Sequence, residues 1–184
     1  MAIEKKKTGR RVLLGVTGSI AAYKAVELLR LFVKNGDEVQ VVMTDAATKF
    51  VAPLTFQTLS RNPVSVDSFA PIVNWKPEHI ALSDWADLVV VAPATANTIA
   101  KMRYGIADNL LTETLLATRA PVVVAPTMNT GMWEAAATQE NVAALKARGV
   151  AVIDPGIGEL ACGASGAGRM PDAEAIFAEI AKLS

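Results

Sequence analysis

The sequence predicts an α/β fold in which a doubly wound, mostly parallel sheet of about five or six strands forms a single domain. Two observations indicate this fold. Short apolar runs rich in valine alternate along the chain with segments of helical periodicity, and such runs are typical of strands buried on both faces. The connections between most of them are short, as in parallel sheets with crossover helices. The length of 184 residues and the apolar content of 52% fit one globular domain with a sizeable core.

The first third of the chain predicts two strands and three helical segments. The strands are residues 12–16 and 39–43, both runs of aliphatic residues. A helix is expected between them because four apolar residues form one stripe: Val26, Leu29, Phe32 and Val33. This helix should cover residues 22–34, and Asn35-Gly36 should end it. Two helical pieces follow, at 46–51 and 53–59.

The middle of the chain predicts a long surface excursion and then a buried strand. Residues 60–78 are rich in proline, asparagine and serine, which favour loops. A short helix at 79–86 leads into the strand at 88–92, LVVVA. Pro93 should end this strand because proline has no N–H to donate to a neighbouring strand. A helix should begin near Thr95.

The last third predicts two more strands and a glycine-rich loop. The remaining elements are a helix at 109–118, a strand at 121–125, a helix at 132–148, a strand at 150–153 and a helix at 172–182. Five glycines fall within residues 154–171. A loop of this length in a compact domain is usually a functional flap or disordered.

Charge and cysteine content exclude several classes of function. The 18 basic and 18 acidic residues cancel, so no nucleic-acid or membrane partner is expected. Residues 1–10 are expected to form a flexible basic tail. No apolar run approaches the roughly 20 residues of a membrane span. One cysteine and one histidine argue against a metal site within one chain. A single cysteine leaves no internal disulfide, which fits a cytoplasmic protein.

Small and hydroxyl-bearing residues follow four of the predicted strands, at 17–19, 44, 93–98 and 126–129. The carboxyl ends of parallel strands meet at the crevice where such sheets bind ligands, and helix N-termini there bind phosphate. Ordinary helix caps would account for the same turns. The chain lacks the G-x-G-x-x-G and P-loop patterns. The Gly18-Ser19 turn therefore fits a single terminal phosphate, as in FMN, better than a dinucleotide.

His79 and Cys162 are the only histidine and the only cysteine. A lone histidine is more often a surface or core residue than a catalytic one. Cys162 follows no predicted strand, whereas a nucleophilic thiolate is usually held at a rigid strand-to-helix turn, so nucleophilic catalysis is disfavoured. A free thiol, with a pKa of about 8.5, is mostly protonated at neutral pH and is suited to act as an acid on a closing flap.

Six motifs occur in one order: GSIA at 18–21, HI at 79–80, PATANT at 93–98, Gly105 with DNLL at 108–111, PTMN at 126–129 with MW at 132–133, and LACG at 160–163. This set resembles that of the homo-oligomeric flavin-containing cysteine decarboxylases, and the match spans residues 10–184. The resemblance implies a flavodoxin-like (Rossmann-like) domain over residues 11–184. It also implies bound FMN and a trimer, or an assembly of trimers, with the flavin near a subunit boundary.

The resemblance assigns FMN contacts to four strand ends. They are Gly18, Ser19, Ile20, Thr44, Ala46, Thr95, Ala96, Asn97, Thr98 and Thr127. This chain departs from the family pattern at two of them, since Thr95 stands where serine is usual and Thr127 where alanine is usual. The first change keeps a hydroxyl. The second adds bulk and a hydroxyl beside the expected flavin.

The implied reaction is the decarboxylation of 4′-phosphopantothenoylcysteine to 4′-phosphopantetheine in coenzyme A biosynthesis. FMN oxidises the substrate thiol to a thioaldehyde, carbon dioxide leaves an ene-thiolate, and the reduced flavin returns the electrons. The resemblance assigns His79 to oxidation and decarboxylation, Asn129 and Met132 to the substrate, and Cys162 to the final protonation. Ala161 is also expected to contact the substrate. We assign Arg169 to the substrate phosphate from its charge and position alone.

The sequence leaves other functions open. A flavin prenyltransferase shares the fold but does not account for the pair His79 and Cys162. A non-enzymatic flavoprotein, either an electron carrier or a regulatory subunit, would use the same scaffold. In bacteria the resembling domain is often the N-terminal half of a bifunctional protein. A fused or separate phosphopantothenate–cysteine ligase is therefore an expected partner, alongside the small-molecule substrate and further copies of this chain.

Overall fold

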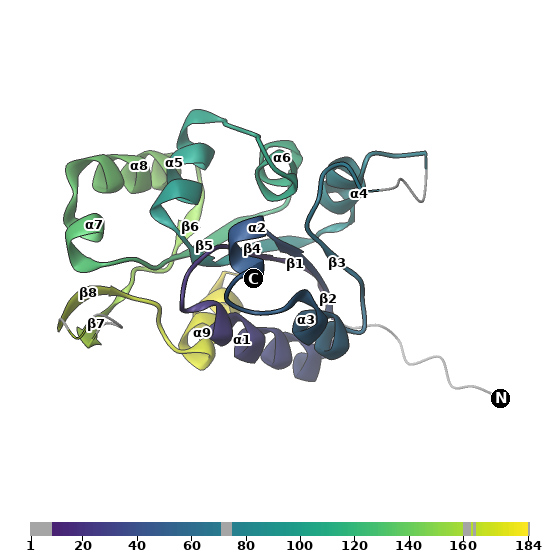
Figure 1. The fold of residues 1–184 in the computed structure, drawn as a ribbon, viewed down its shortest axis with the longest axis horizontal. Helices are drawn as coiled ribbons and strands as arrows, with labels where there is room; N and C mark the ends of the chain where they lie inside the picture. The colour runs from purple at the N-terminus through teal and green to yellow at the C-terminus, as the bar shows by residue number, and fades with distance from the viewer. Residues whose placement is uncertain (1–8, 71–74, 160–162, 164, 184) are drawn as a thin grey trace.

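The computed structural model describes residues 9–70, 75–159, 163 and 165–183, and its centre is a six-stranded sheet (Figure 1). The strands lie in the order β3-β2-β1-β4-β5-β6, and each neighbouring pair is parallel. They are β1 (Arg11–Val16), β2 (Glu38–Met43), β3 (Val64–Ser65), β4 (Leu88–Ala94), β5 (Val122–Pro126) and β6 (Ala151–Val152). The strand order confirms the predicted doubly wound, flavodoxin-like sheet, and it reverses direction between β1 and β4.

The described helices form a layer on each face of the sheet. In chain order they are α1 (Ala22–Asn35), α2 (Asp45–Thr48), α3 (Pro53–Ser60), α4 (Glu78–Trp85), α5 (Ala96–Tyr104), α6 (Leu110–Ala117), α7 (Thr130–Glu134), α8 (Ala136–Ala147) and α9 (Ala173–Lys182). In the view of Figure 1, α1, α3 and α9 lie below the sheet, and α4, α5, α6 and α8 lie above it.

The valine-rich strands are buried on both faces because each face carries its own hydrophobic cluster. In β4, Val90 and Ala92 pack into the cluster between the sheet and the layer of α1, α3 and α9. Val89 and Val91 pack into the cluster between the sheet and the helices on the other face. Successive side chains of a strand point to opposite faces, so an unbroken apolar run fills both cores. The Phe32 and Phe177 rings, 5.4 Å apart, pack edge to face between α1 and α9.

The predicted end of the β4 strand at Pro93 is wrong, because the strand continues to Ala94. Val91 pairs with Val124 but Ala94 pairs with Pro126, so β4 holds one more residue than β5 over this stretch. The peptide bond between Ala92 and Pro93 is cis. A bulge is one of the few places in a sheet that accept proline, because its missing N–H then breaks no ladder bond.

The predicted helix at 132–148 is two helices. The break lies at Ala135, whose backbone is extended (φ −57°, ψ 132°) between α7 and α8. The side-chain oxygen of Asn129 accepts a hydrogen bond from the N–H of Gly131 at 2.9 Å, so α7 begins at Thr130, two residues earlier than predicted. The run of alanines at 135–137 contains no glycine or proline that would have indicated the break.

Two regions predicted as loops contain short strands. The excursion after α3 includes β3, a two-residue edge strand that pairs with Val41 and Val42. The glycine-rich segment contains the antiparallel hairpin β7 (Gly156–Glu159) and β8 (Ser165–Arg169). Glycine lets a strand approach other backbone closely. A Cβ at Gly168, where φ is +128°, would lie 2.2 Å from the carbonyl oxygen of Met128.

No helix among the described residues is long and apolar enough to span a bilayer. Within the same described ranges, no three or more histidine, cysteine, aspartate or glutamate side chains gather as a metal site would require.

Candidate functional site

The ends of β1 and β4 are held together at the point where the strand order reverses. The hydroxyl of Thr17, which is buried, donates to the carbonyl of Pro93 at 2.7 Å and accepts from the N–H of Thr95 at 3.1 Å. These bonds join the turn that precedes α1 to the N-terminus of α5. The predicted strand-end residues on β1 and β4 therefore lie side by side, at the sheet edge where open α/β folds bind ligands.

The turn after β1 is tight and packs directly on the segment after β2. The N–H of Ser19 donates to the carbonyl of Thr17 at 2.9 Å, and the hydroxyl of Ser19 accepts from the N–H of Ala21 at 3.2 Å. A Cβ at Gly18 would lie 2.5 Å from the Cβ of Ala46. Gly18 and Ala46, both assigned to FMN from the sequence, are therefore in contact, while Ile20 beside them is 60% exposed.

Replacing Gly18 with alanine is expected to weaken flavin binding by about tenfold or more, because α2 or the turn must move to relieve the overlap. The measurement is the flavin absorbance that the variant retains through gel filtration at a range of added FMN concentrations. Gly156→Ala is the matched control, since a Cβ there meets its nearest atom at an ordinary 3.7 Å. Full flavin retention by Gly18→Ala would contradict the assignment of this turn to the cofactor.

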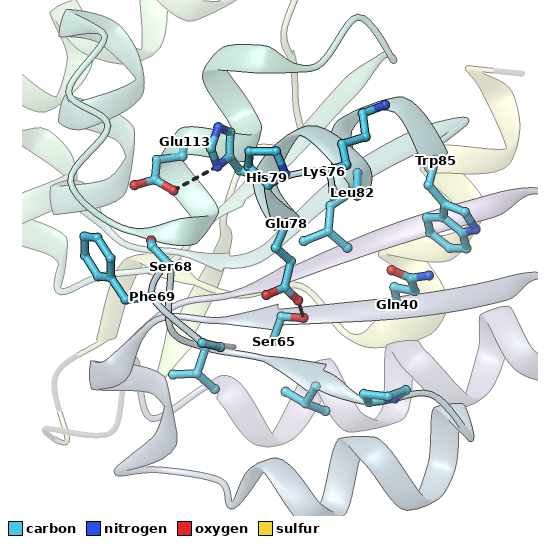
Figure 2. A pocket seen from close by; sticks show the side chains of 16 residues that line it. Gln40, Ser65, Ser68, Phe69, Lys76, Glu78, His79, Leu82, Trp85 and Glu113 are labelled. Carbon is cyan, nitrogen blue, oxygen red and sulfur yellow. Dashed lines mark hydrogen bonds and ion pairs between the residues drawn. The ribbon is translucent and has the colours of Figure 1, made fainter. Parts of the chain in front are cut away.

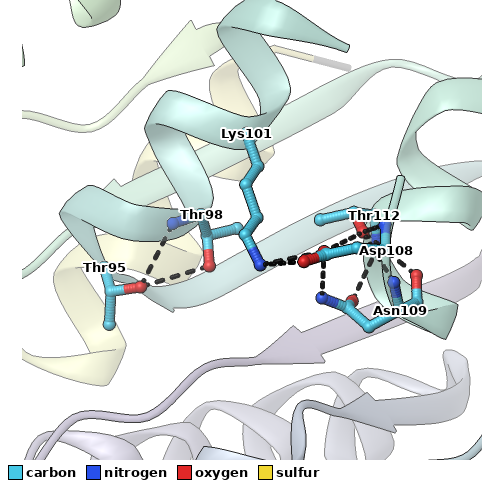
Figure 3. A network of polar contacts seen from close by, with 6 residues as sticks. All are labelled: Thr95, Thr98, Lys101, Asp108, Asn109 and Thr112. Atoms are coloured by element: carbon cyan, nitrogen blue, oxygen red, sulfur yellow. Dashed lines mark hydrogen bonds and ion pairs between the residues drawn. The ribbon is translucent and has the colours of Figure 1, made fainter. Parts of the chain in front are cut away.

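The hydroxyls at the other strand ends cap helices. Thr44 accepts a bond from the N–H of Ala47 at 3.3 Å. Thr95 accepts one from the N–H of Thr98 at 3.3 Å, and its hydroxyl lies 3.1 Å from that of Thr98 (Figure 3). Each threonine thus has the ordinary capping role that the sequence also allowed. In the same turn, the side chain of Asn97 is exposed to solvent and Ala96 is half-buried.

The end of β5 joins the same edge. The N–H of Thr127 donates to the carbonyl of Ala94 at 3.0 Å, and its hydroxyl donates to the carbonyl of Ala125 at 3.3 Å. The extra hydroxyl at this departure from the family pattern is therefore used within the strand. Asn129 and Met132 are exposed at the start of α7, so both side chains are accessible from this edge.

His79 lies in a pocket of its own. It is the second residue of α4, and this helix precedes β4, so its N-terminus faces the carboxyl edge of the sheet. The pocket has a volume of about 590 Å³ and runs between α4, β3 and the segment after β3 (Figure 2). Its lining contains Phe69 and Trp85 but none of the expected flavin contacts. Among the described residues, His79 and the strand-end residues therefore do not line this pocket together.

The segment that follows the β7–β8 hairpin is fixed to α1. The ammonium of Lys24, only 7% exposed, donates to the carbonyl of Met170 at 2.8 Å and to the carboxylate of Asp172 at 2.7 Å. This hydrogen bond, followed by the attraction of the Lys24 charge, lowers the pKa of Asp172. Arg169 lies 3.4 Å from the same carboxylate. Its assignment to a substrate phosphate stays a prediction.

The DNLL motif organises the start of α6 (Figure 3). Asn109 and Thr112 form a reciprocal capping box, with the side chain of each accepting the other's backbone N–H. The ammonium of Lys101 donates to both carboxylate oxygens of Asp108, at 2.6 and 2.8 Å, and these bonds lower the Asp108 pKa. The motif therefore fixes where α6 begins and the direction in which its first turn points.

Three site residues were missed from the sequence: Thr17, Lys24 and Glu113. Lys24 carried a signal, because it lies four residues before Leu28 on the buried side of α1, where a charge needs a partner. Thr17 was noted only as one of several strand-end hydroxyls, and Glu113 lies in an ordinary first helical turn. Ala161 and Cys162 lie outside the described residues, between β7 and β8 in the sequence.

Comparisons with known proteins identify the family of this chain. A family model, Flavoprotein, matches residues 1–184. The Coenzyme A biosynthesis bifunctional protein CoaBC of Vibrio parahaemolyticus is 50% identical over 162 residues, which are 88% of this chain and 41% of that protein. The chain thus spans about two fifths of the length of the curated relatives it matches.

Solved structures share the fold over nearly the whole chain. A PPC decarboxylase with a cysteine-to-serine mutation, complexed with pantothenoylaminoethenethiol, has a TM-score of 0.86 and 33% identity, and the match covers 95% of this chain and 98% of that one. The FMN-dependent cysteine decarboxylase SpaF has a TM-score of 0.81 and 31% identity, with coverage of 97% and 99%. Together with the match to the family model over residues 1–184, these likenesses show that this chain belongs to the Flavoprotein family.

Proposed function

We propose that this chain catalyses the FMN-dependent decarboxylation of 4′-phosphopantothenoylcysteine to 4′-phosphopantetheine, a carboxy-lyase step of coenzyme A biosynthesis. The observation that carries the proposal is the near-complete structural overlap with a PPC decarboxylase that holds pantothenoylaminoethenethiol. That compound has the ene-thiol group expected after oxidation and loss of carbon dioxide. The relatives named CoaBC belong to the same pathway.

The strand-end residues fit FMN. The N-termini of α1 and α5 lie side by side at one edge, joined through Thr17, and helix N-termini bind phosphate through free N–H groups and the helix dipole. The hydroxyl of Ser19 lies in the first of these turns. Ile20 and Asn97 are exposed at these turns and are therefore accessible to a bound ring. When bound, the flavin supplies the electron acceptor and donor that the reaction needs.

The protein groups then have three tasks. His79 accepts the proton that leaves the substrate thiol, or holds the carboxylate that is lost, from its half-buried place on α4. Asn129 binds the substrate with its side-chain amide, and Met132, 50% exposed, contacts the pantothenoyl part. Cys162, with Ala161 beside it, donates the proton of the final step. The cysteine-to-serine enzyme that holds the ene-thiol supports a late role for a cysteine, and this chain has only one.

A homo-oligomer, a trimer or an assembly of trimers, is part of this proposal. Because the pocket of His79 contains none of the same chain's flavin contacts, we place the flavin of a neighbouring subunit against it. Phe69, at the pocket, is 92% exposed and Trp75 nearby in sequence is 90% exposed, and large exposed apolar side chains are typical of interaction surfaces. A single monomeric, flavin-loaded and active species in light scattering would contradict this arrangement.

The place of the reaction follows from its substrate. A phosphopantothenate–cysteine ligase, fused or separate, would form the amide between phosphopantothenate and cysteine that this chain then decarboxylates. The CoaBC relatives are bifunctional, and this chain matches two fifths of their length. We place both activities in the cytoplasm, where a free thiol stays reduced.

The test starts with the visible spectrum of the purified protein. Flavin bands that co-elute with the protein, followed by release of carbon dioxide from 4′-phosphopantothenoylcysteine with formation of 4′-phosphopantetheine, are the expected results. A protein that stays colourless after incubation with FMN would overturn the proposal. A flavin-loaded protein that releases no carbon dioxide would favour the electron-carrier or regulatory reading of the same scaffold.

A further inference from the structure

Glu113, on α6, lies against the imidazole of His79 on α4 (Figure 2). The distance between its Oε2 and the Nδ1 of His79 is 3.5 Å, and the two side chains are 24% and 33% exposed. The Oε2 atom itself is buried and has no hydrogen-bond partner within the described ranges. A carboxylate oxygen without water is costly unless a donor reaches it, and the Nδ1 of His79, 3.5 Å away, needs only a small shift to donate to it.

This contact restricts the state of the imidazole. A neutral imidazole carries one N–H, so a proton held on Nδ1 by the carboxylate leaves Nε2 with a free lone pair. When Nε2 takes a proton from a substrate, the ring becomes positively charged, and the same carboxylate then stabilises that charge. The same buried oxygen, Oε2 of Glu113, would therefore orient the imidazole before the proton transfer and stabilise its positive charge afterwards.

The position of Glu113 is set by the DNLL motif. Its N–H donates to the carbonyl of Asn109 at 2.9 Å, in the first turn of the capped helix. The capping box of Asn109 and Thr112 and the ion pair between Asp108 and Lys101 together hold that turn. The side chain of Glu113 is therefore presented to α4 by a rigid element. Such support is what a residue that orients another side chain requires.

We propose that Glu113 is a positioning residue for His79 that holds the imidazole in the Nδ1–H tautomer, with Nε2 free to accept the substrate proton. The inference rests on the proposed function, because it assumes that His79 acts on the substrate. The competing interpretation is a contact that only joins α4 to α6, which would affect stability and not the turnover of folded protein.

Kinetics separate the two interpretations. Glu113→Met removes the charge and the acceptor at similar length, whereas Glu113→Gln keeps an amide oxygen in reach of Nδ1. We expect Glu113→Met to lower kcat for carbon dioxide release by about 10- to 100-fold, with KM and flavin content within about twofold of the parent, and Glu113→Gln to lose less. Glu140→Met, on the exposed side of α8, is the control. An unchanged kcat in folded, flavin-loaded Glu113→Met would overturn the proposal.

The tautomer gives a readout that does not depend on activity. His79 is the only histidine in the sequence, so histidine labelled with ¹⁵N in untagged protein gives ring signals that need no assignment. At alkaline pH, where imidazole side chains are neutral, we expect Nδ1 to show the shift of a protonated nitrogen in the parent and Nε2 to show it in Glu113→Met. A parent protein with the proton on Nε2 would overturn the proposal. A parent protein without carbon dioxide release would overturn the proposed function together with it.

Discussion

Replacing His79 with asparagine is expected to abolish carbon dioxide release while leaving the flavin bound. Asparagine keeps a donor and an acceptor of hydrogen bonds but does not take up a proton at neutral pH, so the acid–base contribution, about 10²- to 10⁴-fold, is lost. The flavin should remain because the expected flavin contacts lie at the strand ends and His79 is not one of them.

The measurement is carbon dioxide release per bound flavin, with the flavin absorbance of the same sample as its control. His79 is only 33% exposed and contacts Glu113, so replacing it could also lower stability. A thermal unfolding curve is therefore needed to check that the variant is folded. Turnover near the parent value would remove His79 from the reaction. Loss of flavin together with turnover would instead point to a role in cofactor binding.

Replacing Cys162 with serine is expected to separate the two halves of the reaction. A hydroxyl is a far weaker acid than a thiol, so decarboxylation should proceed while the final protonation fails, by about 100-fold or more. Electrons taken from the substrate then stay on the flavin. Without oxygen, carbon dioxide release should stop at about one molecule per flavin.

Mass spectrometry of the anaerobic reaction checks this expectation through the ratio of ene-thiol to 4′-phosphopantetheine. Ser165→Ala, at the exposed start of β8, is the control for a change in the same hairpin. Full formation of 4′-phosphopantetheine by Cys162→Ser would mean that another group donates the proton. A variant that releases no carbon dioxide would place Cys162 before that step.

The parts of the fold that were predictable from the sequence are those whose signal is local. The valine runs of β4 and β5 define strands wherever their partners lie, and the glycine after Asn35 takes the left-handed conformation (φ +91°) that ends α1. The β7–β8 hairpin could not be predicted in this way. Its glycines, such as Gly168, are required by the backbone of Met128, and nothing in a local window indicates that contact.

In the candidate site, too, the residues that were predictable are those with a local signal in the sequence. Turn residues such as Ser19 and Asn129 are predictable because a strand end followed by a helix start is a sequence pattern. Thr17 and Lys24 were missed because their partners are 76 and 146 residues away in the chain. Glu113 was missed because its contact with His79 exists only when α6 packs beside α4. Such pairings are properties of the tertiary structure, and composition or periodicity does not encode them.

The single extra residue in β4 determines which way the groups that follow it face. Along a strand, the side-chain direction alternates, so one inserted residue reverses the direction of everything that follows. Beyond the bulge, the N–H of Thr95 meets the hydroxyl of Thr17. Deleting one residue between Val91 and Ala94 would restore regular pairing with β5 and would turn that N–H away. The valines of the core would keep their places, and the crevice would lose the bond that closes it.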